Sequence, residues 1–346
     1  YKYDKSRVID SFELIKILYL NKDTYLTEMN INNSMVLTSQ FYNKVDLNPT
    51  NLEYSGCNMR PISSNYIDKE DNEDDDDIIN VFFDVETYDD EVEEIIVKHG
   101  KEKKVIKYLK AYLICCKTID RNNKIVSKSF VGNPCAFNFL NYLSKFTQNK
   151  VRLIAHNAGF DYSFIIQHLN GVNECYRGNH FINSSGWFKK KKIIIKDSYN
   201  LLSVKLMKFN SIFGDEVVKS KGVMPFGAYT KINLAKKRIN IDEALEHIYN
   251  EDDRQTFINN CKELEFNNIN PDGKFDMMKY AQYYCLLDCE ILMKGYNIFR
   301  KWIISELSMD VNDILTITGL AHNYFIREGC YEDVYEMSGI PQIFIS

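Results

Sequence analysis

Residues 78–88 read IINVFFDVETY, and this run decides the fold because it places two acids inside an apolar strand. Its Ile, Val and Phe residues are typical of a buried β-strand. Side chains alternate along a strand, so Phe82, Asp84 and Glu86 share one face. Two adjacent carboxylates on a buried strand repel each other and lose hydration, and a divalent metal ion between them would relieve both effects. The alternative is a strand end at which both acids meet water.

The whole chain has the composition of a folded protein of about two domains. Its 346 residues are 45% hydrophobic and 26% charged, enough for a sizeable core. The net charge of -5 excludes a protein that is basic overall and wraps nucleic acid, but it allows a local basic groove. Nine cysteines without a Cys-x-x-Cys pair argue against structural zinc and fit reduced thiols in a protein that is not secreted. No apolar run reaches the ~18 residues that span a bilayer, so we expect no membrane contact.

Strands alternate with helices after residue 80, which predicts the α/β class. The acidic run DKEDNEDDDD at 68–77 predicts a solvated linker at a domain boundary. Gly171, Gly178 and Gly186 predict a loop-rich stretch. Four lysines at 189–192 either border a DNA groove or lie in a solvated hairpin. We expect strands at 78–88, 108–117, 124–131, 151–157 and 189–198, a turn at Asn122-Asn123, and helices at 135–146, 161–169, 201–213, 275–300 and 313–327.

Two further acids lie in apolar surroundings. Asp161 follows a His-Asn-Ala-Gly turn in LIAHNAGFDYSFII (153–166), at a helix start where Asp by itself indicates a helix cap. Asp288 lies in KYAQYYCLLDCEILMKGY (279–296), and Tyr284, four residues earlier, shares its helix face. An acid among leucines and isoleucines is not a typical solvent residue.

Taken together, four acids come from a strand, a strand-to-helix turn and a helix: Asp84, Glu86, Asp161 and Asp288. Such a set can hold two metal ions about 4 Å apart and assist an in-line phosphoryl displacement. Carboxylate oxygens suit Mg²⁺ or Mn²⁺. One ion would activate a water and the other would stabilise the leaving 3′ oxygen, while Tyr284 would orient the water. His156, the histidine nearest these motifs, we interpret as structural.

The segments FDVET, HNAGFD and YCLLD resemble, in order, the three exonuclease motifs of family B DNA polymerases. The Tyr four residues before the last Asp resembles the tyrosine subclass of DEDD exonucleases. KDSYNLL (196–202) is similar to the segment of protein-primed polymerases that contacts a single-stranded 3′ end, although Tyr199 stands where Leu is usual. SKGVMPF (220–226) resembles the Lys-x-x-hydrophobic motif of the same group, with Phe226 where Tyr is frequent. Residues 318–346 resemble the stretch before the palm in polymerases of linear plasmids, mitochondria and viruses.

This resemblance implies an RNase H-like exonuclease domain at 78–300, in which helices flank a mixed sheet. An N-terminal region with the acidic linker would occupy 1–77, and the helical start of the polymerase body would occupy 301–346. The resemblance also implies that Asp84, Glu86, Asp161 and Asp288 bind two Mg²⁺ or Mn²⁺ ions. Tyr284, together with Glu86, would position the attacking water.

For DNA, the resemblance implies that Asn157 and Phe160 hold the last bases of the primer, Phe160 by stacking. Ser198 would contact the same strand, and Lys221 would stabilise the charge of the transition state. The single-stranded 3′ end of DNA is then the expected partner, and a deoxynucleoside 5′-monophosphate the product. In the protein-primed group a terminal protein would be a second partner.

The polymerase motifs Asp-Thr-Asp, Ser-Leu-Tyr-Pro and Lys-x-x-x-Asn-Ser-x-Tyr-Gly do not occur in these residues. We therefore expect the N-terminal part of a proofreading DNA polymerase, or a truncated gene product. The first alternative is a stand-alone 3′–5′ exonuclease that acts on DNA or RNA. The second is a non-catalytic DNA-binding remnant, against which the intact acids and Tyr284 argue. An intracellular location is expected, and the sequence does not separate a mitochondrial, linear-plasmid or viral origin.

Overall fold

The computed structural model describes residues 53–54, 57–61, 77–97, 101–214, 222–263, 273–330 and 335–338, with side chains for all of these except 53–61, 91–107 and 335–338. The chain divides into two units. One comprises Tyr1–Asp71 with Ala321–Ser346, and the other comprises Asn72–Leu320. The domain limits at 77 and 300 stay predictions.

The first unit contains a three-stranded antiparallel sheet in the order β1-β2-β12. Its strands are β1 (Glu53–Tyr54), β2 (Cys57–Pro61) and β12 (Tyr335–Ser338). The sheet thus joins a segment near the start of the chain to one near its end. The other residues of the predicted region 1–77, except Asp77, lie outside the described residues.

The second unit is built on a seven-stranded mixed sheet in the order β5-β4-β3-β6-β9-β8-β7. β6 lies parallel to both β3 and β9, and the other neighbouring strands pair antiparallel. The predicted α/β class with a mixed sheet is confirmed. The strands are β3 (Ile78–Val97), β4 (Lys101–Ile119), β5 (Ile125–Val131), β6 (Lys150–Ala155), β7 (Asn170–Arg177), β8 (His180–Phe188) and β9 (Lys191–Asp197).

The prediction of a loop-rich stretch around Gly171, Gly178 and Gly186 is wrong. These residues lie in or between β7 and β8, which pair as an antiparallel hairpin. Gly178 has a φ of 60° at the turn, a conformation that glycine adopts easily. β7 is an exposed edge strand, so its sequence lacks the apolar alternation by which strands are recognised.

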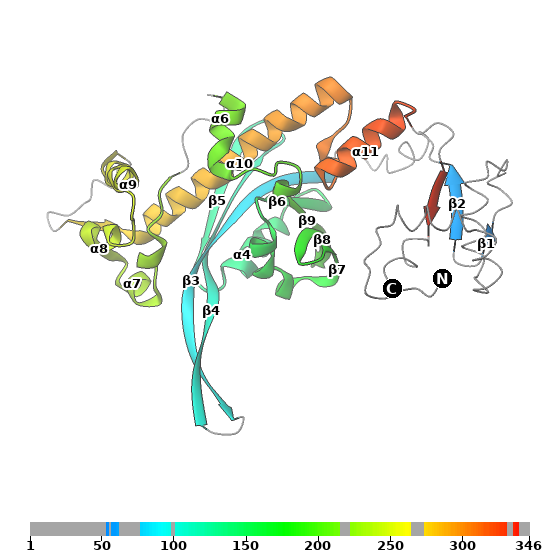
Figure 1. Ribbon diagram of the computed structural model, residues 1–346. Helices are drawn as coiled ribbons and strands as arrows, with labels where there is room; N and C mark the ends of the chain where they lie inside the picture. The colour runs from blue at the N-terminus through cyan, green and yellow to red at the C-terminus, as the bar shows by residue number, and fades with distance from the viewer. Residues whose placement is uncertain are drawn as a thin grey trace, which may run out of the picture. The chain divides into compact units, whose positions relative to one another are not determined.

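Helices cover both faces of this sheet (Figure 1). α4 (Cys135–Leu143) packs on one face, where Phe139 stacks on Phe83 with ring centroids 5.6 Å apart. α10 (Met277–Leu307) crosses the other face, where Tyr296 meets Phe82 edge-on at 5.6 Å. The predicted alternation along β3 is confirmed, because Phe82 and Phe83 enter different core clusters.

The predicted helix at 201–213 is shorter than expected, because Lys205 is extended (ψ 143°) and only α6 (Phe209–Phe213) is α-helical. Likewise the helix predicted at 161–169 is reduced to α5 (Gly159–Ser163) and a 3₁₀ turn. The last of the described helices is α11 (Ile317–Arg327).

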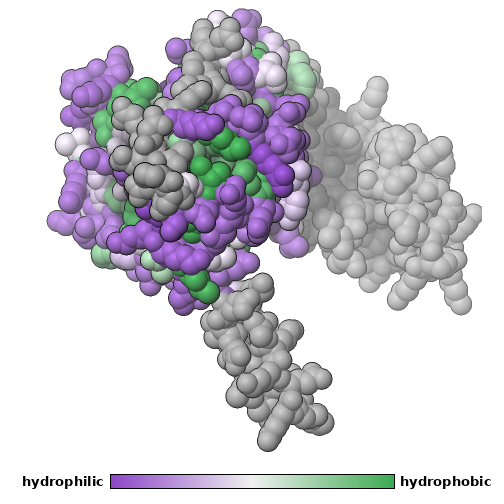
Figure 2. Space-filling model, turned by 90° about the vertical axis from the view of Figure 1, so that its left-hand side faces the viewer, coloured by the Kyte–Doolittle hydropathy of each residue, from purple (hydrophilic) through white to green (hydrophobic). Residues whose placement is uncertain are grey.

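A small helical lobe precedes α10 and packs against the first half of that helix. Phe257 of this lobe contacts Tyr280 of α10 with ring centroids 4.8 Å apart. Just before the lobe, the Tyr229 hydroxyl donates a hydrogen bond to the Met277 carbonyl (2.9 Å). Figure 2 views the side on which this lobe lies and shows hydrophobic residues gathered within a largely hydrophilic surface. The lobe consists of α7 (Lys231–Lys236), β10 (Arg238–Asn240), α8 (Ile241–Leu245), α9 (Glu251–Glu263) and β11 (Lys274–Asp276).

β3 and β4 extend beyond the sheet as a two-stranded ribbon (Figure 1). They stay paired to Val97 and Lys101, whereas β6 pairs with β3 only up to Phe82. The strand predicted at 78–88 is therefore longer than expected. Among the described helices, none combines the length and apolar character needed to cross a membrane.

Candidate active site

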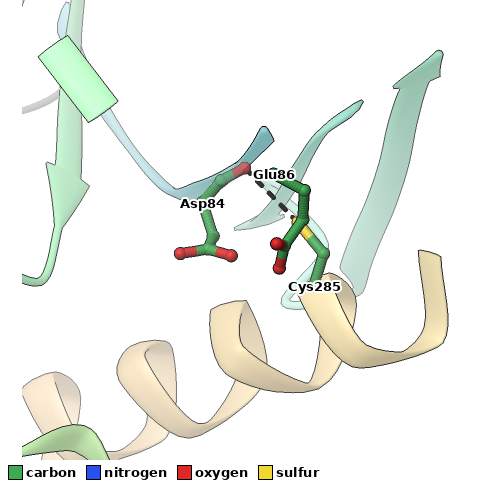
Figure 3. A group of neighbouring side chains, drawn as sticks. All are labelled: Asp84, Glu86 and Cys285. Carbon is green, nitrogen blue, oxygen red and sulfur yellow. Dashed lines mark hydrogen bonds between the residues drawn. The ribbon is translucent and has the colours of Figure 1, made fainter. Parts of the chain in front are cut away.

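Asp84 and Glu86 lie on β3 just beyond the point where its pairing with β6 ends. Both point toward α10 (Figure 3), as the alternation of the strand predicts. Glu86 is 5% exposed, and Asp84 is half-buried. Directly after Glu86 the β3–β4 register shifts, which marks a β-bulge. Bulges commonly re-aim side chains next to active sites.

Asp161 reaches the same strand from α5. Its Oδ1 accepts a hydrogen bond from the Val85 backbone amide at 3.0 Å, and the residue is 4% exposed. It is not a helix cap, because the N-cap position of α5 is Ala158. Burial and the neighbouring Asp84 carboxylate raise the pKa of Asp161, while the Val85 amide opposes this rise.

Asp197, the last residue of β9, fixes the turn before α5 by hydrogen bonding. Asn157 has a φ of 67°, a left-handed conformation that Asn adopts more readily than most residues. Its amide donates to Asp197 Oδ1 at 2.9 Å, and the same oxygen accepts from the Tyr199 amide. These two hydrogen bonds to Asp197 fix the position of the turn that carries Asn157 and leads to Phe160.

Tyr284 and Asp288 project from α10 toward β3, and they are 2% and 4% exposed. Burial first, and then the negative charges of Asp288, Glu86 and Asp84, raise the pKa of Tyr284. A hydrogen bond with Asp288 acts in the same direction. The Tyr284 hydroxyl therefore keeps its proton and is a neutral donor among carboxylates.

These side chains line one cavity of about 290 Å³. A second cavity of about 490 Å³ shares Asp84, His156, Asn157 and Asp288 with it and extends to Tyr199 and Lys205. Of the residues predicted for the site, the structure brings seven together around the first cavity: Asp84, Glu86, Asn157, Phe160, Asp161, Tyr284 and Asp288.

Among the described residues predicted for the site, Ser198 alone does not line this cavity. Ser198 has no exposed surface, and its hydroxyl donates to the Ala155 carbonyl (2.9 Å) and lies 2.9 Å from His156 Nδ1. His156 Nε2 bonds the Val204 carbonyl at 2.7 Å, which fits its structural interpretation. Lys221 lies outside the described residues.

Two residues that border the acids carried no predicted role. Phe226 is 60% exposed, lines the first cavity and meets the Tyr284 ring edge-on at 6.0 Å. Gly222 permits the approach of its segment, because a Cβ there would lie 3.2 Å from the Tyr284 ring. The motif around 220–226 was the signal that could have identified Phe226.

Cys285 is the second such residue. Its Sγ donates to the Asp84 backbone carbonyl at 3.4 Å (Figure 3), and it lies within 4.8 Å of carboxylate oxygens of Asp84 and Glu86. Burial raises the pKa of the Cys285 thiol well above its usual range. Its hydrogen bond to the Asp84 carbonyl supports the main chain of β3, and a soft sulfur is not a ligand that Mg²⁺ prefers. Its sequence context, a Cys inside an apolar helix, is that of ordinary core packing.

The donor set fits divalent metal ions. Four carboxylates converge, three of them almost fully buried, and no Lys or Arg is among the described residues that line the first cavity. Buried acids in such a group need a positive charge between them. Hard oxygen donors of this kind match Mg²⁺ and Mn²⁺.

The amino-acid sequence matches a known family of DNA polymerases. A model of DNA polymerase type B, organellar and viral, matches residues 143–341, more than half of the chain. No curated protein sequence matches the chain.

Among solved structures, phi29 DNA polymerase complexed with single-stranded DNA is similar with a TM-score of 0.33 and 16% identity. That match covers 64% of this chain, which spans only 32% of the phi29 chain. A Drosophila P element transposase strand transfer complex gives a TM-score of 0.19 and 12% identity over 91% of this chain and 86% of that chain. Both likenesses are too remote to carry an argument about function. On the family match, the chain belongs to the organellar and viral type B DNA polymerases, as its acidic motifs predict.

Proposed function

We propose that this chain carries the 3′–5′ exonuclease of a proofreading type B DNA polymerase. The observation that supports it is the convergence of four carboxylates and Tyr284, from three separate elements, around one cavity. Asp84, Glu86, Asp161 and Asp288 would hold two Mg²⁺ or Mn²⁺ ions. Ions bound there supply two effects, activation of a water and stabilisation of the leaving 3′ oxygen.

Tyr284 and Glu86 orient the attacking water in this proposal. Tyr284 keeps its proton, so it donates a hydrogen bond to the water, while the Glu86 carboxylate accepts one. The Val85 amide fixes the carboxylate of Asp161 next to the strand that carries Asp84.

The 3′ end of single-stranded DNA is the proposed substrate. Phe160 is 41% exposed at the rim of the first cavity and offers a stacking surface to the terminal base, next to Asn157. The exposed Lys205 in the second cavity is suited to neutralise a phosphate further along the strand. Lys221 would stabilise the charge of the transition state, and the product would be a deoxynucleoside 5′-monophosphate.

Ser198 would act on the DNA indirectly, through the bond to His156 that fixes the turn; a direct contact stays a prediction. A terminal protein as partner, and an intracellular origin in an organelle, linear plasmid or virus, belong to the same proposal.

The test uses 5′-labelled single-stranded DNA with and without Mg²⁺. We expect a metal-dependent ladder that shortens from the 3′ end, and we expect Asp84→Ala with Glu86→Ala to abolish it while circular dichroism and Tm show an intact fold. A folded double mutant that still degrades the DNA would refute the metal assignment. A 3′-phosphorothioate end linkage, which should slow the first cut, distinguishes attack at that end from internal cleavage.

A further inference from the structure

The bulge beside the acids lies on β4. Glu86 pairs with Leu113 and Thr87 pairs with Ala111, so Tyr112 is an extra residue with no partner in the register. Its backbone carbonyl accepts a hydrogen bond from the Gly132 amide at 2.8 Å, which holds the bulge in place. An extra residue in one strand changes the face to which its side chain points.

Tyr112 therefore lies on the face of the acids. Regular alternation would place it with Ile114, which packs in the core under α4. Instead it packs with Leu113, Tyr284 and Cys285 in the cluster along α10. The bulge brings Tyr112 into the same cluster as Tyr284, on the side of the sheet to which Glu86 points.

The Tyr112 hydroxyl is buried and makes no hydrogen bond to any described residue. The side chain is 4% exposed, and its ring stacks on Tyr229 with centroids 5.8 Å apart and planes 15° apart. Buried hydroxyl groups nearly always have a partner, so one that does not calls for an explanation. The hydroxyl of Tyr229, in the same stacked pair, already has one in the Met277 carbonyl.

The Glu86 carboxylate, which points toward α10 on the same side of the sheet (Figure 3), is the partner to which this hydroxyl is suited. Burial, and then the negative charge of Glu86, raise the pKa of Tyr112 far above its usual range. The phenol thus keeps its proton and lies in the field of the Glu86 carboxylate. Carboxylates that bind metal ions are commonly oriented by a hydrogen-bond donor behind them.

We propose that Tyr112 is a positioning residue for Glu86, whose carboxylate accepts a hydrogen bond from the buried Tyr112 hydroxyl when a divalent ion is bound. The inference rests on the proposed function, since it assigns Glu86 to a metal ion. It gives the bulge a purpose, because regular pairing would turn Tyr112 to the other face. Tyr284 and Tyr112 would then act on Glu86 as two neutral donors, one through the water and one directly.

The test compares Tyr112→Phe with the matched control Tyr229→Phe. Each removes one oxygen from the stacked pair, but only the Tyr229 oxygen has a hydrogen bond to lose. We would measure the rise in Tm as Mn²⁺ is titrated, which reports binding without catalysis, and the Mg²⁺ dependence of DNA degradation.

For Tyr112→Phe we expect an unchanged Tm without metal and an increase of about tenfold in the half-saturating Mn²⁺ and Mg²⁺ concentrations. For Tyr229→Phe we expect a lower Tm and unchanged half-saturation. Unchanged half-saturation in Tyr112→Phe, with a wild-type chain that binds Mn²⁺ and degrades DNA, would overturn this inference alone. A wild-type chain that neither binds Mn²⁺ nor degrades DNA would overturn the proposed function, and this inference with it.

Discussion

Asp90 and Asp161 are buried to nearly the same extent, 6% and 4% exposed, but their surroundings are opposite. At the base of the β3–β4 ribbon, Lys110 and Lys231 approach the Asp90 carboxylate at 2.5 and 3.1 Å and lower its pKa. In the candidate site, burial and the Asp84 carboxylate raise the pKa of Asp161. A buried acid between lysines is a complete ion pair. A buried acid facing another acid needs a cation from outside the chain.

The largest expected effect comes from neutralising each of these two aspartates in turn. Asp161→Asn keeps an acceptor for the Val85 amide but removes the charge, so we expect DNA degradation to fall by about a thousandfold with Tm unchanged or higher. Asp90→Asn removes the partner of two lysines, so we expect a lower Tm and normal degradation. Rates on labelled DNA and thermal unfolding without metal measure both. A less stable, active Asp161→Asn variant would make Asp161 a structural residue like Asp90.

DNA binding at the candidate site should depend on an exposed aromatic ring. Phe160 and Phe137 are similarly exposed, 41% and 46%, but only Phe160 lines the described cavities. Stacking of one base contributes about 1–3 kcal/mol, so Phe160→Ala should weaken single-stranded DNA binding by about tenfold or more. Phe137→Ala should leave binding unchanged. Fluorescence anisotropy in Ca²⁺, a divalent ion intended to slow turnover, measures both affinities, and equal loss in both variants would remove Phe160 from the DNA path.

Lys196 is a buried charged residue whose pKa is also shifted toward its neutral form, so it can be compared with Asp161. It is 2% exposed and donates to the Val311 and Asn312 carbonyls, and burial, with Arg152 next, lowers its pKa to about 7. Its pKa in the unfolded chain is about 10.4. Between these values the unfolded chain binds more protons, so this group makes folding stability rise with pH.

Lys196→Met should therefore be more stable than wild type below pH 7, by a few kcal/mol at most. The advantage should vanish toward pH 10, where the neutral amine is no longer penalised and keeps hydrogen bonds that Met lacks. Urea unfolding at pH 6.5 and 9.5 measures the difference, which should shrink or reverse. A difference independent of pH would mean that Lys196 is not desolvated. Because its donors already meet two carbonyls, Lys196 is a structural residue, unlike Asp161.

The placement of the acids followed from local periodicity. Asp84 and Glu86 share a face because strand side chains alternate, and Tyr284 with Asp288 share a face because four residues make about one helical turn. Both relations are fixed within a short segment, so the sequence was enough. The roles assigned to these residues stay predictions that the variants above test.

Other features depended on tertiary contacts. Regular alternation would turn Tyr112 away from Glu86, and only the register with β3 reveals the bulge. Phe226 reaches Tyr284 from a segment separated by more than fifty residues, and no local pattern encodes that contact. Ser198 stands in a motif associated with DNA, but β9 carries it into the core, where its hydroxyl is bonded.

Substitution of Cys285 should have the smallest effect, and it tests whether a residue close to the acids is also a metal ligand. Its sulfur is as close to Asp84 and Glu86 as a shared ion requires, but it donates to the Asp84 carbonyl, and Mg²⁺ prefers oxygen ligands to sulfur. Cys285→Ser keeps a donor at this position, so we expect the half-saturating Mg²⁺ concentration to stay within about twofold of wild type. Asp161→Asn, by contrast, should abolish saturable binding. If Cys285→Ser shifted the Mg²⁺ dependence as strongly as the loss of a carboxylate does, the sulfur would belong to the metal site, and proximity would outweigh the chemical type of the donor atom in identifying ligands there.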